Sequence, residues 1–234
     1  MPGLRLSRFG IVLCLTIAAV AQEDSAPADK SKIKPVNETV VVTGTFAPAP
    51  QNDIDRAVTV VGIDSQPGLY NNWVDLLELV PSVDLRQRGT NNIQGDLSIR
   101  GSGFGETLVL LDGFRMDDVQ TGHHDMDLPI PTTAVDRIEV MRGAGSALYG
   151  SDAMAGSVNV ITAKPEHSDI RVGAGVGNFG VNQQYGSASL VWKEIDTQLD
   201  AERDFSSGFR PDRDYRSATF FDRTGFETGL GSSC

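Results

Sequence analysis

The sequence predicts an α+β domain, a small mixed β-sheet with short helices, followed by the first antiparallel strands of an incomplete transmembrane β-barrel. Two stretches carry this prediction. Residues 136–162 read as a strand, a glycine corner, a helical turn and a second strand. From Asp169 onward, apolar and polar residues alternate with the two-residue period of a strand that has one apolar face.

Composition and charge exclude several classes of function. The chain has 234 residues and a formal net charge of −11, so nucleic acid is not an expected partner. Its two cysteines, Cys14 and Cys234, cannot form a disulfide framework. The glycines of residues 101–105 are not read as a phosphate loop, because Glu106 stands where a third glycine is needed and no helix follows. With no catalytic triad, metal cluster or cofactor loop in the sequence, we expect neither enzyme activity nor a cofactor.

Residues 1–21 have the features of a secretory signal peptide. Arg5 and Arg8 precede an apolar run that is too short to span a bilayer as a helix. Ala19-Val20-Ala21 fits cleavage before Gln22. A short buried helix is the alternative, and the charge, the length and the cleavage site together argue against it. Residues 22–37 are rich in Ala, Pro, Lys, Asp and Ser, which predicts a disordered linker.

The elements before the glycine corner are read as short strands and one helix. Residues 72–80 have helical spacing, with Val74 and Leu77 facing inward, Leu76 as a further candidate and Pro81 closing the helix. The expected strands are residues 58–61, 97–100 and 107–111, and residues 112–113 form a turn.

The glycine corner and its two flanking strands read as a scaffold, because no nucleophile in them is paired with a base. The strands are residues 137–141 and 157–162, and the second should place Val158 and Val160 on one face. The corner between them would hold Arg142 in a fixed place. The expected helix caps are Ser146 and Ser151, with Gly150 ending the first turn.

Two polar segments, residues 83–97 and 117–127, read as solvated loops or as loops that face a polar ligand. His123 and His124 are adjacent, and adjacent histidines point in different directions on most backbones, which argues against a metal site. The polar side chains concerned are Gln87, Thr90, Asn91, Asn92 and Gln94 in the first segment, and Asp118, Gln120, His123 and His124 in the second.

Two sequence blocks resemble the plug domain of TonB-dependent outer-membrane receptors. One is RIEV, RG and SALYG within residues 136–162; the other is LELVP at residues 77–81 followed by SIRGSGFGETLVLLDG at residues 98–113. Their order and separation are specific, and the resemblance covers about residues 38–165. The chain departs from the family pattern at Ala144, where proline is common, and at Ala155, where glycine is usual. The blocks look most similar to the cobalamin receptor subgroup, although ferric-siderophore receptors share most of these residues.

The resemblance implies a domain order and a mode of energy coupling. It places a plug domain at residues 51–165 and, in a flexible linker at residues 22–50, a TonB box that pairs with the energy transducer of the inner membrane. A short β-prone run suits pairing with a sheet edge of a partner. An ordinary first strand of the plug is the alternative. The residues of the expected box are Glu38, Thr39, Val40, Val41, Val42 and Thr43.

The resemblance also implies the activity of the parent protein. A receptor of this family lies in the outer membrane of a Gram-negative bacterium, against outer-membrane lipid, with its plug on the periplasmic and lumen side. It takes up a scarce nutrient, here cobalamin or a ferric siderophore, and the two polar segments would face that ligand. The other possibilities are a free-standing periplasmic plug-like binding module and a non-functional fragment with no transport activity.

Arg100 and Arg142 match two family arginines that acidic residues of the barrel wall hold in place, which locks the plug. Arginine suits such pairing, because a partly buried guanidinium is costly without a carboxylate partner. The alternative is that both side chains extend to water. The wall partners are expected beyond residue 234.

The alternation within residues 169–234 fits an outer-membrane barrel, with apolar residues towards lipid and polar residues towards the lumen. A soluble antiparallel sheet with one wet face would show the same period. A spanning strand takes about 10 residues, and plugged transporters need about 22 strands. Residues 169–234 allow about six spans at most, so we expect a truncated barrel that does not close.

Overall fold

The computed structural model describes residues 40–41, 49–50, 56–63, 70–89, 91, 93–118, 120–228 and 231–233. The chain divides into two compact units, Met1–Asn37 and Glu38–Cys234, and everything described lies in the second. The expected signal peptide and most of the linker therefore fall outside the described residues, as do Glu38, Thr39, Val42 and Thr43 of the expected TonB box. The rest of that box, β1 (Val40–Val41), pairs antiparallel with β2 (Ala49–Pro50).

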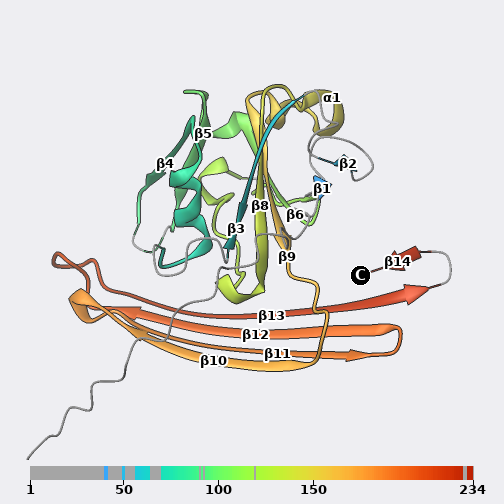
Figure 1. Ribbon diagram of the computed structural model, residues 1–234. Coiled ribbons are helices and arrows are strands. Elements are labelled where there is room, and N and C mark those ends of the chain that lie inside the picture. The colour runs from blue at the N-terminus through green and yellow to red at the C-terminus, as the bar shows by residue number, and fades with distance from the viewer. Residues whose placement is uncertain are drawn as a thin grey trace, which may run out of the picture. The chain divides into compact units, whose positions relative to one another are not determined.

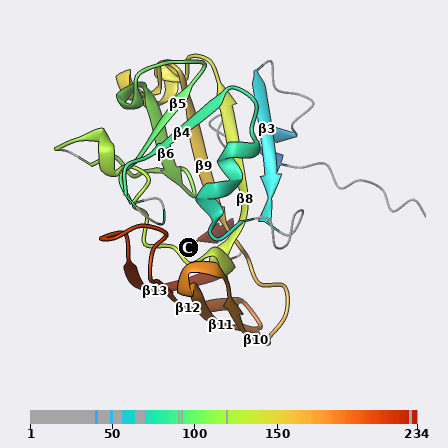
Figure 2. The ribbon, with the colours of Figure 1, turned by 90° about the vertical axis from the view of Figure 1, so that its left-hand side faces the viewer.

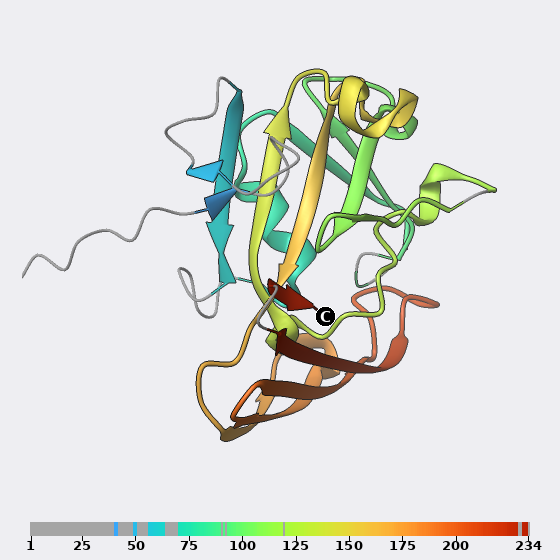
Figure 3. The same cartoon turned by 90° about the vertical axis from the view of Figure 1, so that its right-hand side faces the viewer.

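A five-stranded mixed sheet forms the centre of the α+β domain (Figure 1). Only β6 and β9 run parallel; the other neighbouring strands are antiparallel. The order across the sheet is β3 (Ala57–Gly62), β8 (Val135–Arg142), β9 (Gly156–Thr162), β6 (Thr107–Leu111) and β7 (Phe114–Arg115). Figure 3 shows these strands side by side, from β3 in blue to β6 in green. The small mixed sheet predicted from the sequence is confirmed.

One face of this sheet carries the main hydrophobic core. Val158 and Val160 of β9 lie on it together, as predicted, with Ile138 and Val140 of β8. The opposite face is more polar: Ser157 and Asn159 are fully buried there, close to the small cluster around Leu108 and Leu110. The core fixes the position of every strand that leads into the polar segments.

The expected helix is present as the 3₁₀ helix η3 (Trp73–Leu79). Its cap is reciprocal: Asn72 Oδ1 accepts the Val74 amide at 2.9 Å, and Asp75 Oδ2 accepts the Asn72 amide at 3.3 Å. Val74 and Leu77 face the core as predicted, together with Leu76 and with Trp73, which the sequence reading missed.

Several boundaries differ from the sequence prediction. The first polar segment is not all loop, because β4 (Val83–Gln87) and β5 (Gly95–Ile99) form a two-stranded sheet in front of the mixed sheet (Figure 2). Ser146 and Ser151 were expected to be helix caps, and both expectations are wrong by one residue. Helix α1 (Ser146–Tyr149) is preceded by Gly145, and the 3₁₀ turn η7 (Ser151–Ala153) by Gly150. Neither glycine has a side chain, so both turns begin without a side-chain cap. Gly150 has a φ of 89°, which glycine adopts without strain.

The chain continues as a meander of antiparallel strands, here called the meander sheet (Figure 1). Its strands pair in sequence order and the sheet does not close, as predicted. They are β10 (Asp169–Val176), β11 (Asn182–Trp192), β12 (Ile195–Ser206), β13 (Tyr215–Thr228) and β14 (Gly231–Ser233). A two-residue turn links β11 to β12, whereas residues 177–181 and 207–214 form longer links at the other end.

In the meander sheet, apolar side chains are exposed and polar side chains are buried, which is the reverse of a soluble sheet. Ile170 and Val172 are each 80% exposed and Phe220 is 81% exposed, whereas Gln198 is 2% and Asp200 3% exposed. A soluble sheet with one wet face would bury its apolar side. An outer-membrane barrel does the reverse, because its apolar side meets lipid. The alternative of a soluble antiparallel sheet is therefore contradicted, and the meander sheet is the start of a transmembrane barrel.

The three short 3₁₀ turns η4 (Phe104–Glu106), η5 (Gly122–His124) and η6 (Thr132–Ala134) connect the core to the polar segments. Within the described ranges, no helix is long and apolar enough to cross a bilayer.

A charge placed on the exposed apolar side of the meander sheet should lower the stability of the fold. Phe220→Arg should lower the free energy of unfolding in phospholipid bilayers by about 2–4 kcal/mol, because the guanidinium would face hydrocarbon. Denaturant titration of the full-length receptor in vesicles measures this loss. Glu194→Arg, in the exposed β11–β12 turn, is the control and should change stability little. Equal effects of the two substitutions would contradict a lipid-facing Phe220.

Candidate functional site

The two polar segments come together around one buried carboxylate. Asp96 of β5 accepts hydrogen bonds from Arg88 Nε at 2.7 Å and from His123 Nδ1 at 2.5 Å. The His123 ring also stacks on Phe104, with 4.2 Å between the ring centroids. Burial by itself raises the pKa of Asp96, but the hydrogen bonds and charges of His123 and Arg88 outweigh it and leave the pKa below its usual value. Asp96 thus ties the second segment to the first.

A second carboxylate repeats the arrangement nearer the surface. Asp127 accepts the backbone amide of Gln94 at 2.8 Å and His124 Nδ1 at 2.6 Å. The hydrogen bond to Asp127 raises the pKa of His124 above its ordinary value. The two segments therefore form one surface whose shape depends on Asp96 and Asp127.

The adjacent histidines bind different carboxylates, Asp96 and Asp127. In the part of the chain that the structure describes, no three His, Cys, Asp or Glu side chains gather in a way suited to a metal ion. Both imidazoles act here as hydrogen-bonding groups that hold the loops.

The other predicted ligand-facing residues have varied positions. Gln87 is exposed at the end of β4, and Asn91 accepts a hydrogen bond from Asn72 Nδ2 at 3.2 Å. Asp118 accepts the backbone amides of Gln120 and Thr121, which lowers the pKa of its carboxyl group. Thr90 and Asn92 lie outside the described residues.

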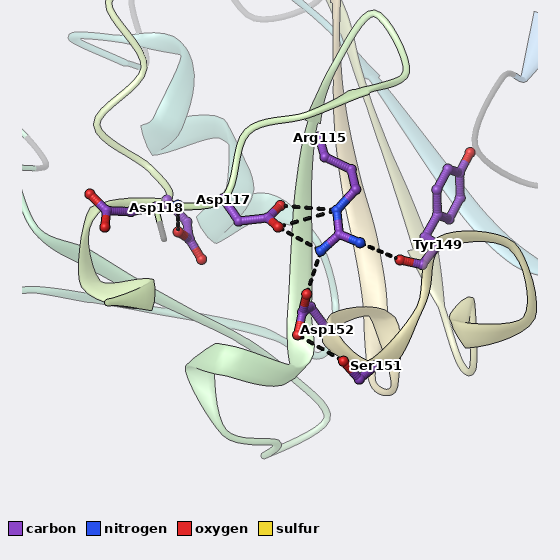
Figure 4. Close-up of polar contacts among 7 residues, drawn as sticks. Arg115, Asp117, Asp118, Tyr149, Ser151 and Asp152 are labelled. Carbon is purple, nitrogen blue, oxygen red and sulfur yellow. Dashed lines mark hydrogen bonds and ion pairs between the residues drawn. The ribbon is translucent and has the colours of Figure 1, made fainter. Parts of the chain in front are cut away.

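Arg115 of β7 connects the second polar segment to the glycine corner (Figure 4). Its Nη2 donates to Asp117 Oδ2 at 2.5 Å and also to Asp152, and its Nη1 donates to the Tyr149 carbonyl oxygen at 2.8 Å. The hydrogen bond to Asp117 is the main reason why the pKa of Arg115 is raised. The sequence reading missed this hub, because its partners are 2, 34 and 37 residues away along the chain.

Arg100 and Arg142, the two arginines predicted to lock the plug, have no carboxylate partner among the residues that the structure describes. Arg142 Nη2 donates to Thr59 Oγ1 at 2.7 Å, and its Nε is buried without a hydrogen-bond partner. Arg100 is exposed at the end of β5. The two residues are therefore placed at strand ends, as expected, while the predicted lock itself stays a prediction.

Side chains of the meander sheet form hydrogen bonds with backbone groups of the α+β domain. Glu202 Oε2 accepts the Thr132 amide at 2.8 Å, and Gln198 Nε2 donates to the Thr133 carbonyl oxygen at 3.4 Å. Nearer the longer links, Arg213 Nη1 donates to the Arg88 carbonyl oxygen at 3.3 Å. These contacts place the first polar segment beside the end of the sheet that carries the longer links.

A hollow of about 400 Å³ lies between the first polar segment and those links. Basic and aromatic side chains are prominent in its lining: Arg88, Arg210, Arg213, Phe179, Phe209 and Tyr215. Guanidinium groups and ring faces suit a planar or anionic ligand.

Comparison with known proteins agrees with this architecture. The family described as TonB-dependent Receptor Plug Domain matches residues 50–157. The chain carries a TonB-dependent receptor plug domain. The matched residues include both polar segments, the glycine corner, and β3, β6, β7 and β8 of the mixed sheet, and the meander sheet lies after them.

Two relatives each match about two thirds of the chain. The chain is 34% identical over 167 residues to the vitamin B12 transporter BtuB of Vibrio vulnificus, covering 66% of this chain and 27% of that protein. It is 35% identical over 172 residues to an iron-regulated outer membrane virulence protein of Vibrio cholerae, covering 69% of this chain and 25% of that protein. The chain thus spans about a quarter of the length of these relatives.

Solved structures show the same fold at lower identity. The pyoverdine outer membrane receptor FpvA of Pseudomonas aeruginosa, bound to pyoverdine, has a TM-score of 0.69 at 19% identity, covering 81% of this chain and 28% of that one. The alcaligin outer-membrane receptor FauA of Bordetella pertussis has a TM-score of 0.65 at 20% identity, covering 82% of this chain and 32% of that one.

The contact between His124 and Asp127 makes the plug surface sensitive to pH. Because the pKa of His124 is raised in the folded state, its contribution to stability is complete below about pH 6.5 and is lost as the pH rises through the folded pKa. NMR titration of the imidazole should give a pKa above about 6.5 in the native protein. Asp127→Asn should bring the value back towards the ordinary one. A His124 pKa that Asp127→Asn does not lower would contradict the assigned contact.

Proposed function

We propose that the chain is the N-terminal part of a TonB-dependent outer-membrane receptor that takes up a scarce nutrient by energised transport. The supporting observation is that a plug domain and an inverted, lipid-facing sheet occur in one chain and contact each other. A free-standing periplasmic module would be surrounded by water, where strands with an exposed apolar side are unfavourable. The relatives are named as a transporter and as an outer-membrane protein, which also argues against an enzyme.

The proposal assigns each stretch of the chain a place. Residues 1–21 direct export, residues 22–50 form the flexible linker, residues 51–165 form the plug and residues 169–234 begin the barrel. Outer-membrane barrels have short periplasmic turns and longer extracellular loops. The β11–β12 turn is then periplasmic, and the first polar segment, beside the longer links, faces the outside.

The ligand would meet the surface formed by the two polar segments. The names of the relatives point to cobalamin or an iron chelate. The arginines and rings that line the hollow of about 400 Å³ favour an anionic ferric siderophore. The amides and imidazoles of Gln94, His123 and His124 shape that surface through Asp96 and Asp127.

Residues 38–43 would act as the TonB box. β1 already forms a β-pairing with β2, so this part of the chain can offer its backbone to a sheet edge. Pairing with the energy transducer would replace the internal pairing and transmit a pull to the plug.

Arg100 and Arg142 would lock the plug to acidic residues of the barrel wall. The support is that the Arg142 Nε is buried without a partner, which is costly for a guanidinium that has no carboxylate. In the complete receptor, the wall would supply the missing acceptor.

A backbone change tests the TonB box. In the full-length receptor, Val41→Pro removes a backbone donor and restricts Val40, so nutrient uptake should fall at least about tenfold while ligand binding at the cell surface stays intact. Val41→Ala keeps the donor and is the matched control, with near-normal uptake. Normal uptake with Val41→Pro would place the box elsewhere.

A charge change tests the lock. In the full-length receptor, Arg142→Met should speed amide exchange across residues 137–162, because it removes the hydrogen bonds to Thr59 and to the Pro81 carbonyl oxygen together with the charge that the wall would hold. Thr59→Val removes the shorter of these hydrogen bonds, 2.7 Å against 3.4 Å, keeps the charge and is the control. If the two variants exchange at the same rate, the charge of Arg142 locks nothing.

A further inference from the structure

The plug rests on the meander sheet at η6. Thr132 and Thr133 are bound through their backbone by Glu202 and Gln198 of β12. Asp200 lies between these two residues on the same face of the strand, since side chains alternate along β12. Ser187 of β11 is the direct cross-strand partner of Asp200. Asp200 and Ser187 therefore lie directly beneath η6.

Three side chains in this small area are buried without a hydrogen-bond partner. Neither carboxylate oxygen of Asp200 has one, although the residue is only 3% exposed. The hydroxyl groups of Ser187 and Thr133 are also buried without a hydrogen-bond partner, and Ser187 is 3% exposed. Buried polar groups in folded proteins are normally satisfied, so a cluster of three points to a bound species that they share.

The charge of the cluster indicates what that species is. A buried carboxylate without a partner is far more costly than a buried hydroxyl, and a second carboxyl group, that of Glu202, lies two residues along the strand. The nearest basic side chains of the meander sheet are engaged elsewhere. Arg223 Nη1 binds Asp196 at 3.0 Å, and the exposed Arg171 binds Asp169 at 3.4 Å. A water molecule would satisfy hydrogen bonds but leave the charge, whereas a cation satisfies both.

We propose that Asp200, Ser187 and Thr133 form a site for a hard cation that joins the foot of the plug to the barrel wall. All the donors are oxygen atoms, the ligands that such cations prefer. The described residues hold no group of three or more acidic, His or Cys side chains suited to a metal, so water would have to complete the shell. A hollow of about 720 Å³ is lined in part by Thr133 and Glu202, and one of about 620 Å³ is lined in part by Ser187 and Asp200.

The site contacts both the plug and the wall, so an occupied site holds η6 in place. Loss of the cation leaves the Asp200 carboxyl group buried without a partner, which favours movement of η6 away from the wall. This inference concerns the attachment of the plug and does not depend on which nutrient is transported.

Amide exchange with defined cations tests the proposal on the folded whole chain in detergent. CaCl₂, MgCl₂ and NaCl are each titrated at constant ionic strength. At 100 times its dissociation constant, one of them should slow exchange of the η6 amides by about 100-fold. Asp200→Asn should abolish this response, and Asp84→Asn, which changes an exposed carboxylate on β4, should leave it intact. No response of the native chain to any of the three cations would overturn the proposal.

Two milder variants keep the test decisive if Asp200→Asn does not fold. Thr133→Val and Ser187→Ala each remove one oxygen donor and should raise the cation concentration at half-effect severalfold. An unchanged response in both would show that the cation binds elsewhere. If Asp200→Asn slows exchange of the η6 amides and the native chain shows no cation response, the buried carboxylate only weakens the attachment, and the proposal is wrong.

Discussion

The bilayer imposes one constraint on which the rest of this structure depends: the strands of the meander sheet must turn apolar side chains outward. Residues such as Ile170, Val172 and Phe220 face out, and alternation then forces Gln198, Asp200 and Glu202 inward. That polar inner face has to be covered by groups that can bond to it. Glu202 and Gln198 bond to backbone groups of the plug, and Phe221 packs against the plug's hydrophobic core.

Long-range charge contacts then shape the surface formed by the two polar segments of the plug. Asp96 joins the two polar segments through Arg88 and His123, and Arg115 joins the second segment to the glycine corner. These contacts link the outer loops to β8 and β9, the strands that anchor the core. A ligand that displaces either loop would therefore act on groups connected to the centre of the plug.

Periodic and local features of the fold could be predicted from the sequence, and distant pairings could not. The two-residue alternation predicted β10 to β13, and the helical spacing of residues 72–80 with Pro81 predicted η3, because these signals involve neighbouring residues. Asp96 and Arg115 looked like ordinary polar residues, since their partners are 27 and 37 residues away. The cap predictions at Ser146 and Ser151 failed because the glycines before them begin the turns without a hydroxyl group.

Site-specific labelling along β12 (Ile195–Ser206) tests whether the apolar side chains of the meander sheet face lipid. A nitroxide is attached at single cysteines, one position at a time, and its collisions with lipid-soluble oxygen and with a water-soluble nickel chelate are measured in bilayers. Collision rates should alternate from one residue to the next. Oxygen should reach Leu199 and Ala201, whereas the plug should shield Gln198 and Asp200 from both reagents. Access of the nickel chelate to Leu199 and Ala201, or the loss of alternation, would contradict it.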